Sequence, residues 1–164
     1  MKMMKKLTAV ALMGAMSLSL AACGGDNTAS NDDKTYKVGV IQYVENGAFN
    51  DMREGFIEEM RTLGYDEDKL EIDYQNAQTD ATNLNTICQS MADGSYDAVC
   101  TIATPATQGM VNMESETPVF FISVSAPVAA GVLTDMEKPD KNATGTSNAI
   151  PVSDIFALSD QLTP

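Results

Sequence analysis

The stretch that decides the fold reads Ala98-Val99-Cys100-Thr101-Ile102-Ala103 and is followed at once by Thr104-Pro105. A nearly continuous apolar run of this kind is typical of a central parallel strand that is covered on both faces. Threonine at an N-cap, with proline at the first helical position, is a specific pattern for the start of a helix. The sequence therefore predicts a buried strand that passes directly into a helix.

The same alternation of strand and helix patterns extends on both sides of this stretch. Strand-like runs occupy residues 36–44, 70–74 and 118–124. Between them, apolar side chains recur at steps of three and four residues, which indicates amphipathic helices. These side chains are Phe49, Met52, Phe56, Met60 and Leu63 in one helix, and Ala81, Leu84, Cys88 and Met91 in the next. Strands and helices in this rhythm form βαβ units, so we expect an α/β fold with a Rossmann-like parallel sheet flanked by helices.

The charge and composition of the chain exclude several classes of function. Ten Lys and Arg residues stand against 23 Asp and Glu residues, which gives a formal net charge of −13. A chain this acidic lacks a basic surface that neutralises phosphates, so nucleic acid is not expected as a partner. Histidine is absent, which excludes Ser-His and Cys-His catalysis and imidazole metal sites. Because glycine-rich phosphate loops and a Gly-x-Ser-x-Gly elbow are also missing, we expect no enzyme, no cofactor and no metal.

The first residues carry the pattern of an exported lipoprotein. Lys2, Lys5 and Lys6 give the first residues a positive charge. The apolar stretch 7–20 follows them and is shorter than the about 20 residues that a membrane-spanning helix needs. Leu20-Ala21-Ala22-Cys23 then places small residues before a cleavage point and a cysteine directly after it. We expect residues 1–22 to be a lipoprotein signal peptide and Cys23 to carry the lipid. The protein is then extracytoplasmic and anchored to the cell membrane by its acyl chains.

The composition changes again after the predicted lipid site. Residues 24–34 hold no apolar side chain longer than alanine, so they cannot bury enough surface to offset the loss of chain entropy. We expect residues 23–35 to comprise the lipidated cysteine and a flexible tether. Residues 36–145 then form one α/β ligand-binding lobe.

Cys88 and Cys100 allow two interpretations. Cys88 falls on the apolar face of a predicted helix and Cys100 inside the predicted buried strand, where a free cysteine packs as a small hydrophobe. An exported protein can also join two cysteines in a disulfide. The sequence favours packing and leaves the disulfide open, because it does not give the distance between the two Cα atoms.

Polar side chains follow the predicted strands at the points where the strands end. Gln42, Asn76, Thr104 and Ser123 lie at four such ends. In an open parallel sheet, ligands bind beyond the carboxyl ends of the strands. Amide and hydroxyl groups can hold a polar solute through hydrogen bonds, but they supply no pair of nucleophile and base. The sequence therefore predicts a binding site for a small polar solute at this edge of the sheet.

Several segments of the predicted lobe match a known family. They are Val38-Gly39-Val40-Ile41-Gln42-Tyr43-Val44-Glu45, Arg53-Glu54-Gly55-Phe56, Ile72-Asp73-Tyr74-Gln75-Asn76-Ala77-Gln78, Ile102-Ala103-Thr104-Pro105-Ala106, Thr117-Pro118-Val119-Phe120 and Asn142-Ala143-Thr144-Gly145. From Val38 to Pro164 the chain resembles the ABC transporter substrate-binding proteins of the tryptophan/tyrosine type. The resemblance implies a type I periplasmic-binding-protein fold, in which two Rossmann-like lobes close on a small solute. It also implies ABC permease subunits as partners and, as in parts of the family, an aromatic amino acid as the ligand.

The resemblance also implies which residues touch the solute. Thr104, with free backbone N–H groups at Ala106 and Thr107, is expected to receive a carboxylate, because a helix N-terminus favours an anion. The full set of implied ligand-binding residues is Gln42, Tyr43, Asn76, Gln78, Thr104, Ala106, Thr107, Ser123 and Ser125.

The chain departs from the family pattern at two places in this set of loops. Where the family commonly has His-Pro and then Asp, this chain has Asn46-Gly47 and then Asn50. Where the family commonly has Asp-Pro, this chain has Ala126-Pro127. The cleft therefore has fewer carboxylates than in the family. This weakens the expectation that the site binds an α-amino group in the way that family members do. A small polar solute is therefore the first expectation, and an aromatic amino acid a narrower one.

The chain is also shorter than members of this family. Residues 146–164 are expected to be the hinge crossing and the first helix of a truncated second lobe, because Val152, Ile155, Phe156 and Leu162 form an apolar face with nothing to pack on. One lobe lacks half of the cleft wall, so we expect this chain to be a fragment that binds weakly or not at all. The alternative function is a ligand-sensing or surface-interaction lipoprotein that uses the same lobe.

Overall fold

The structure is a computed structural model and describes residues 34–162. The predicted signal peptide, Cys23 and the tether up to residue 33 lie outside the described residues.

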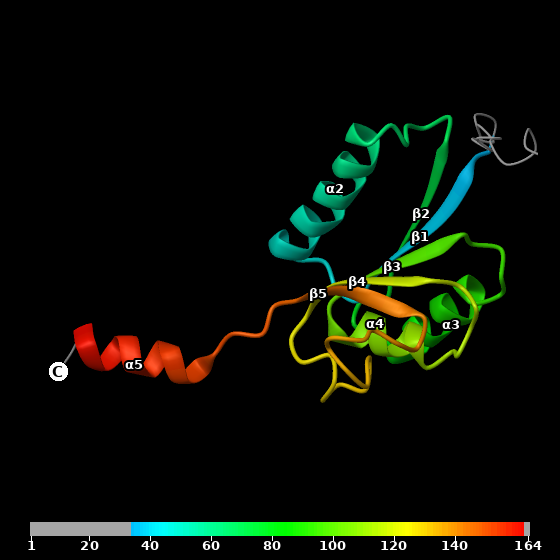
Figure 1. The fold of residues 1–164 in the computed structure, drawn as a ribbon. Helices are drawn as coiled ribbons and strands as arrows, with labels where there is room; N and C mark the ends of the chain where they lie inside the picture. The colour runs from blue at the N-terminus through cyan, green and yellow to red at the C-terminus, as the bar shows by residue number, and fades with distance from the viewer. Residues whose placement is uncertain (1–33, 163–164) are drawn as a thin grey trace, which may run out of the picture. The chain divides into compact units, whose positions relative to one another are not determined.

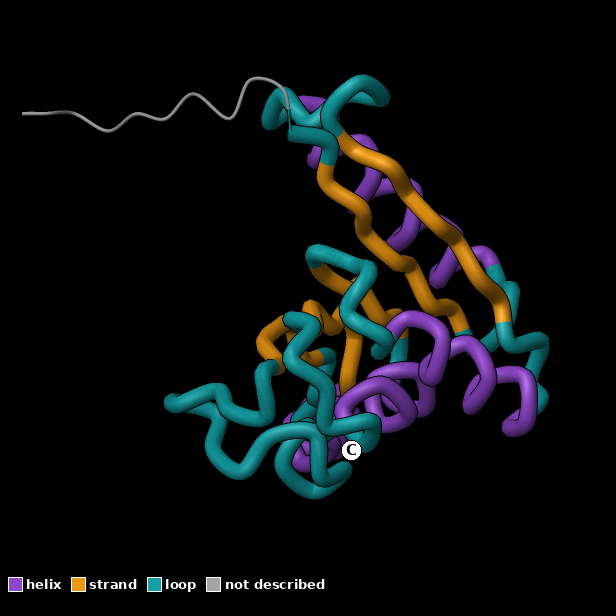
Figure 2. Tube along the Cα trace, turned by 90° about the vertical axis from the view of Figure 1, so that its right-hand side faces the viewer, coloured by secondary structure: helices purple, strands orange, loops and turns teal. Residues whose placement is uncertain are grey.

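The centre of the described chain is one parallel sheet (Figure 1). Its strands are β1 (Tyr36–Gln42), β2 (Leu70–Asn76), β3 (Ala98–Ile102), β4 (Val119–Val124) and β5 (Ala143–Ser147). The order across the sheet is β2-β1-β3-β4-β5, and every neighbouring pair is parallel. Figure 2 shows β1 and β2 side by side along their length. The predicted α/β architecture is confirmed, with β5 as a strand that the sequence patterns did not indicate.

Three helices, α2 (Gly47–Thr62), α3 (Ala81–Met91) and α4 (Thr104–Val111), cover the two faces of this sheet. The last helix, α5 (Val152–Leu162), packs on neither face. Figure 1 shows α2 on one side of the strands and α3 with α4 on the other. Phe49, Met52 and Phe56 of α2 pack with Val40 and Cys100. In the opposite layer, side chains from α3 and α4 pack with Ile41, Val99 and Phe121 in the main core cluster.

The alternation of side chains along β1 explains why both faces are apolar. Val38 and Val40 face α2, whereas Ile41 faces α3 and α4. Gly39 also lies on the α3 side, where an added Cβ would overlap the Sδ atom of Met91. The glycine therefore allows α3 to approach the central strand closely.

Side chains cap two of the helices, whereas the start of α4 differs from the prediction. Asn46 caps α2 by accepting the N–H of Phe49 at 2.9 Å, and Asp80 caps α3 in the same way. The prediction that Thr104 caps α4 is wrong, because Ala103 is the N-cap and Thr104 is the first helical residue. The physical reason is that the chain already turns at Ala103, whose φ of 71° lies in the left-handed region.

The two cysteines that the structure describes are both free and buried. Cys88 packs in the core between the sheet and α3, while Cys100 packs on the other face with residues of α2. A disulfide between them is excluded because the sheet separates them, so the packing interpretation is confirmed. Burial raises the pKa of Cys88 to about 11 and that of Cys100 to about 12. Both thiols are therefore protonated and unreactive at neutral pH.

Tyr96 and Asp73 form a hydrogen bond that makes the stability of the fold depend on pH. The Tyr96 hydroxyl donates to Asp73 Oδ2 at 2.5 Å and joins the segment before β3 to β2. Burial, and then this bond to a carboxylate, raise the pKa of Tyr96 to about 12 from 10.0. The folded state holds the phenol proton more tightly than the unfolded chain does. This contribution is therefore complete below pH 10 and is lost as the pH rises towards 12.

We expect Tyr96→Phe to reduce the loss of stability at alkaline pH. The variant lacks the titrating proton, so its free energy of unfolding falls less steeply between pH 10 and pH 12 than that of the wild type. Urea unfolding followed by circular dichroism at a series of pH values measures both slopes. Equal slopes in the two proteins contradict the role given to this hydrogen bond.

After β5, residues 148–162 are all exposed. Every residue of α5 is exposed, including the apolar face predicted from Val152, Ile155, Phe156 and Leu162. The assignment of residues 146–164 to a hinge crossing stays a prediction. Among residues 34–162, no helix has both the length and the apolar character that crossing a bilayer requires.

Candidate functional site

The carboxyl ends of the strands meet at one edge of the sheet. Gln42 pairs in register with Asn76 on one side and with Ile102 on the other, and Ile102 pairs with Ile122. The four polar exits predicted from the sequence, Gln42, Asn76, Thr104 and Ser123, therefore lie along the same edge. β1 leads into α2 on one face, whereas β3 leads into α4 on the opposite face. Such a reversal between neighbouring strands opens a crevice, which is the usual ligand site of α/β sheets.

A groove of about 480 Å³ lies at this edge, between the segments that follow β1 and β2. We call it the rim groove, and its lining residues are Val44, Glu45, Tyr74, Asn76, Gln78 and Thr79. Asn76 and Gln78 were predicted as ligand-binding residues, whereas Glu45 and Tyr74 were not. The lining combines two amides, two hydroxyls, an aromatic ring and one carboxylate. It can hold a polar solute with an apolar part.

Gln42 is fully buried and does not line the rim groove. Its Nε2 atom donates to Val44 O at 2.9 Å and to Asn50 Oδ1 at 2.8 Å. Its Oε1 atom accepts from Arg53 Nη1 at 3.4 Å. The expectation that Gln42 contacts the solute does not fit this burial. Gln42 instead holds the loop after β1 against α2.

Arg53, which the sequence patterns did not indicate, links Gln42 of β1 to Tyr74 of β2. Its side chain is only 16% exposed, and its Cζ atom lies 4.4 Å from the centre of the Tyr74 ring. Asn76 Nδ2 donates to the Tyr74 hydroxyl at 3.2 Å, and Asn76 Oδ1 accepts the N–H of Gln78 at 2.7 Å. A chain of contacts thus runs from Gln42 through Arg53 and Tyr74 to Asn76. It fixes the position of the groove's aromatic wall.

Tyr43, which the resemblance implies as a ligand-binding residue, packs against the core. It is half-buried, packs against the core on the side of α3 and α4, and donates its hydroxyl to Thr79 O at 2.9 Å. Thr79 N–H in turn donates to Tyr43 O at 2.9 Å. Tyr43 therefore ties the exits of β1 and β2 together, and a contact with solute stays a prediction.

The start of α4 offers fewer free donors than predicted. The expectation that the Thr107 N–H is free is wrong, because this group donates to Ala103 O at 3.2 Å. The Thr107 hydroxyl is buried as well, within hydrogen-bonding distance of Thr101 Oγ1 at 2.9 Å and donating to Ala103 O. Thr104 is half-buried and Ala106 is buried. Contacts of these two residues with a carboxylate stay predictions.

The two serines at the carboxyl end of β4 differ in their exposure. Ser123 is 9% exposed and its N–H donates to Thr146 Oγ1 of β5 at 3.4 Å. Ser125, two residues later, is exposed. Of the two, Ser125 has the more accessible hydroxyl, and a role for either in binding stays a prediction.

Left-handed backbone conformations concentrate at this edge. Four of the seven non-glycine residues with positive φ within residues 34–162 lie at this edge: Gln78 (54°), Thr79 (64°) and Ala103 (71°) follow strands, and Ser123 (63°) is the penultimate residue of β4. Each such residue costs about 1–3 kcal/mol, and they gather at active sites and ligand clamps. The strain therefore marks the same edge that the polar side chains mark.

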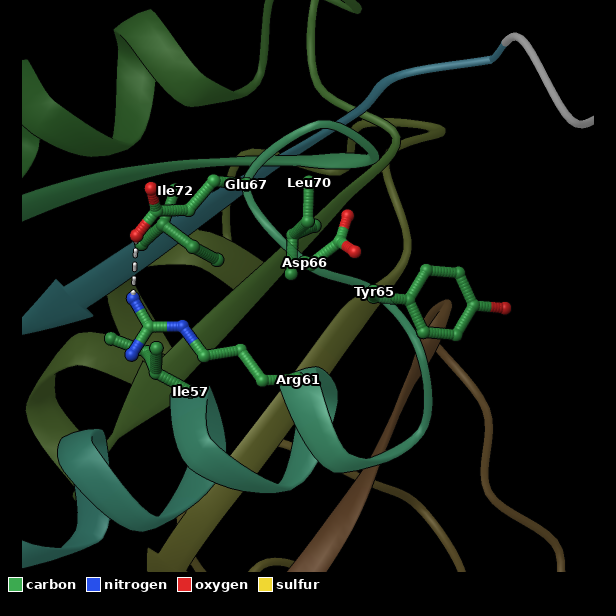
Figure 3. A pocket seen from close by; sticks show the side chains of 7 residues that line it. All are labelled: Ile57, Arg61, Tyr65, Asp66, Glu67, Leu70 and Ile72. Atoms are coloured by element: carbon green, nitrogen blue, oxygen red, sulfur yellow. Dashed lines mark hydrogen bonds and ion pairs between the residues drawn. The ribbon is translucent and has the colours of Figure 1, made fainter.

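A second hollow, drawn in Figure 3, lies by the first residues of β2, at the opposite end of that strand from the rim groove. It measures about 250 Å³ and lies between the end of α2 and the start of β2, with Ile57, Arg61, Tyr65, Asp66, Glu67, Leu70 and Ile72 as its lining. Arg61 points to Glu67 and pairs with it at 3.3 Å (Figure 3). Both side chains are more than half exposed, so this pair contributes little. Nothing about this hollow indicates a solute site.

Comparisons with known proteins identify similar chains of about twice this length. The sequence profile of the ABC transporter substrate binding protein family matches residues 37–164. The tyrosine-binding protein of Clostridioides difficile (strain R20291) is 31% identical, and the alignment covers 98% of this chain and 49% of that protein. The chain therefore spans about half the length of the curated relatives it matches.

Two solved structures share the fold as well. One is an ABC domain from Streptococcus pneumonia in complex with L-Trp, at 29% identity and a TM-score of 0.71, covering 74% of this chain and 41% of that chain. The other is the ligand-free, open structure of a Clostridium difficile substrate-binding protein with adhesive properties. It is 34% identical with a TM-score of 0.74, and the match covers 79% of this chain and 44% of that chain.

Proposed function

This chain belongs to the ABC transporter substrate-binding protein family, and from that premise we propose that its rim groove is one wall of a small-solute site serving an ABC importer. The observation that carries the proposal is the gathering of amide, hydroxyl and carboxylate side chains around a groove of about 480 Å³ at the carboxyl ends of the strands. The family consists of binding proteins and not of enzymes, as the composition predicted.

The proposed ligand is an aromatic L-amino acid. Relatives at 31% and 29% identity are described as tyrosine-binding and as a complex with L-Trp. In this chain, the Tyr74 ring provides a flat apolar wall, and Asn76 and Gln78 provide hydrogen-bonding groups beside it. An amino acid with a ring and two polar groups matches this combination better than a uniformly polar solute does.

A titration of the chain with L-tryptophan, L-tyrosine and the neutral polyol xylitol tests this assignment. Because one wall leaves most of the ligand in water, we expect saturable binding of the aromatic amino acids near about 1 mM, equivalent to about −4 kcal/mol. Xylitol is expected not to bind. Binding of xylitol alone, or of none of the three, contradicts the assignment.

The second wall is proposed to come from a second lobe, as in a type I periplasmic-binding-protein fold. In that arrangement, the segment after β5 crosses towards the second lobe, and α5 finds its packing partner there. Closure of two lobes buries most of a small ligand and strengthens each polar contact. A chain that carries both lobes is then expected to bind the same amino acid at least about a hundredfold more tightly, a difference of about 2.7 kcal/mol.

We also propose that Cys23 is the lipid anchor that keeps the protein at the outer side of the cell membrane, close to permease subunits. The support is Leu20-Ala21-Ala22-Cys23 directly after the apolar stretch 7–20. Acyl chains contribute about 0.8 kcal/mol for each buried methylene, so several chains form a stable anchor.

Replacing Cys23 by alanine is expected to release the protein from the membrane. Expressed in a bacterium and fractionated, the wild type sediments with membranes, whereas Cys23→Ala is recovered mainly in the soluble or secreted fraction. Ser30→Ala, a change in the predicted tether, is the control and is expected to behave as the wild type does. An equal membrane-bound fraction for Cys23→Ala and the wild type contradicts the anchor.

An adhesive role is the second candidate function, because one similar structure is described as a substrate-binding protein with adhesive properties. In this case the same lobe presents a surface to another cell. Deleting the gene then reduces attachment of the bacterium to that surface and leaves uptake of aromatic amino acids unchanged. The transport proposal requires that the deletion reduces uptake of aromatic amino acids and leaves attachment unchanged.

A further inference from the structure

The rim groove contains one charged side chain, Glu45. The remaining lining residues in the described chain are neutral, with amides at Asn76 and Gln78 and hydroxyls at Tyr74 and Thr79. Glu45 is exposed, and none of the ion pairs within residues 34–162 includes it. The groove therefore presents a carboxylate that no cationic side chain neutralises.

The basic residue closest to this groove along the contact network is already engaged. Arg53 lies over the Tyr74 ring, donates to Gln42 and pairs with Glu54 at 3.3 Å. Its side chain is 16% exposed, and Arg53 does not line the groove. The cation of Arg53 is thus used to position Tyr74 and leaves Glu45 available to a ligand.

Other acidic groups near the strand ends are absent or occupied. Position 50 is an asparagine whose Oδ1 atom accepts from Gln42 at 2.8 Å. Position 126 is an alanine. Asp80 caps α3 by accepting the N–H of Asn83 at 2.8 Å. Of the acids at the exits of β1 and β2, Glu45 is the one that lines the groove.

We propose that Glu45 receives the ammonium group of the solute, so that the groove selects ligands with a positively charged amine. This inference rests on the proposed function and names the chemical class that the same site takes. An ammonium group donates up to three hydrogen bonds and gains from the uncompensated carboxylate. The Tyr74 ring is placed to contact an apolar or aromatic part, which leads to an amino acid or a small aromatic amine as the solute.

A pair of ligands that differ only in the amine tests the role of Glu45. L-Tryptophan carries the ammonium group, and indole-3-propionate is the same molecule without it. Nuclear magnetic resonance titrations of the ¹⁵N-labelled protein give both dissociation constants even for weak binding. We expect the wild type to prefer L-tryptophan by about fivefold, the upper range for an exposed ion pair, and Glu45→Gln to bind both ligands equally.

A control variant and a salt series separate this role from a structural one. Glu58→Gln changes an exposed acid on α2 that does not line the groove, and it is expected to keep the wild-type preference. In 1 M salt, where the screening length is about 3 Å, the preference of the wild type is expected to shrink, and that of Glu45→Gln to stay near one.

The possible outcomes distinguish the inference from the proposed function. If Glu45→Gln retains the wild-type preference for L-tryptophan, the role of Glu45 is overturned, while binding at the groove stands. If the wild type binds neither ligand, the proposed function fails and this inference fails with it. If the wild type and Glu58→Gln prefer L-tryptophan and Glu45→Gln does not, the result supports both the role of Glu45 and the proposed function.

Discussion

Replacing Gly145 by alanine is expected to destabilise the fold by about 3 kcal/mol, the upper range for overpacking a tightly packed site. Gly145 lies in β5 opposite Phe121 of β4. A Cβ atom added at Gly145 would overlap the carbonyl oxygen of Phe121 and would also lie 2.7 Å from its carbonyl carbon. These are backbone atoms, so the overlap can be relieved only by separating the two strands.

Gly55→Ala is the matched control for this prediction. Gly55 lies in α2 and an added Cβ there has no neighbour within 4 Å. Alanine is favoured over glycine inside a helix by about 0.5–1 kcal/mol, so this variant is expected to be more stable than the wild type. Urea unfolding followed by circular dichroism measures both changes. If the two variants shift the free energy of unfolding in the same direction, the close approach at Gly145 is refuted.

Gln42→Leu is also expected to lower the free energy of unfolding strongly. Leucine has a similar size but no polar atoms, so Val44 O, Asn50 and Arg53 each lose a buried partner. An unsatisfied buried polar group costs about 1–3 kcal/mol, and some of the three groups can turn to water. We expect a loss of about 3 kcal/mol in the free energy of unfolding, together with weaker binding of L-tryptophan.

Gln78→Leu serves as the control, because Gln78 lines the rim groove but is exposed. Exposed substitutions usually change stability by less than about 0.5 kcal/mol. We expect this variant to bind less tightly and to unfold at nearly the same urea concentration as the wild type. A fully stable Gln42→Leu protein would show that the buried network does not support the groove.

Gln42 lies at the end of β1, as the sequence predicts, but its side chain is fully buried, and a contact with solute stays a prediction. Side chains alternate along a strand, and Gln42 has the same parity as Val38 and Val40, which face α2. The same parity rule applied to the sequence indicates a residue buried under α2 and not one open to solvent.

Two other features depend on contacts between distant parts of the chain. β5 reads Ala-Thr-Gly-Thr-Ser and only Ala143 in it is buried, so it carries no apolar pattern. It becomes a strand because β4 offers a free edge, which no local pattern reveals. The structural role of Arg53 likewise depends on its contact with the Tyr74 ring, and Tyr74 lies on a different element.

By contrast, the central strands, α2 and α3 could be predicted from local periodicity alone. β3 is apolar at nearly every position because both of its faces are covered. The gathering of strand ends at one edge followed from the parallel order. The detailed lining of the groove did not, because it depends on how the loops after β1 and β2 fold over each other.

The most direct test of the central claim is to map where L-tryptophan changes the backbone amide resonances of the ¹⁵N-labelled protein. We expect the largest changes at the carboxyl ends of the strands, in residues 43–46 and 76–79, with smaller ones at 104–107 and 123–125. Residues 61–67, at the opposite end of the sheet, are expected to stay unchanged. Changes concentrated at residues 61–67, or spread evenly over the whole lobe, would contradict a solute site at the rim groove.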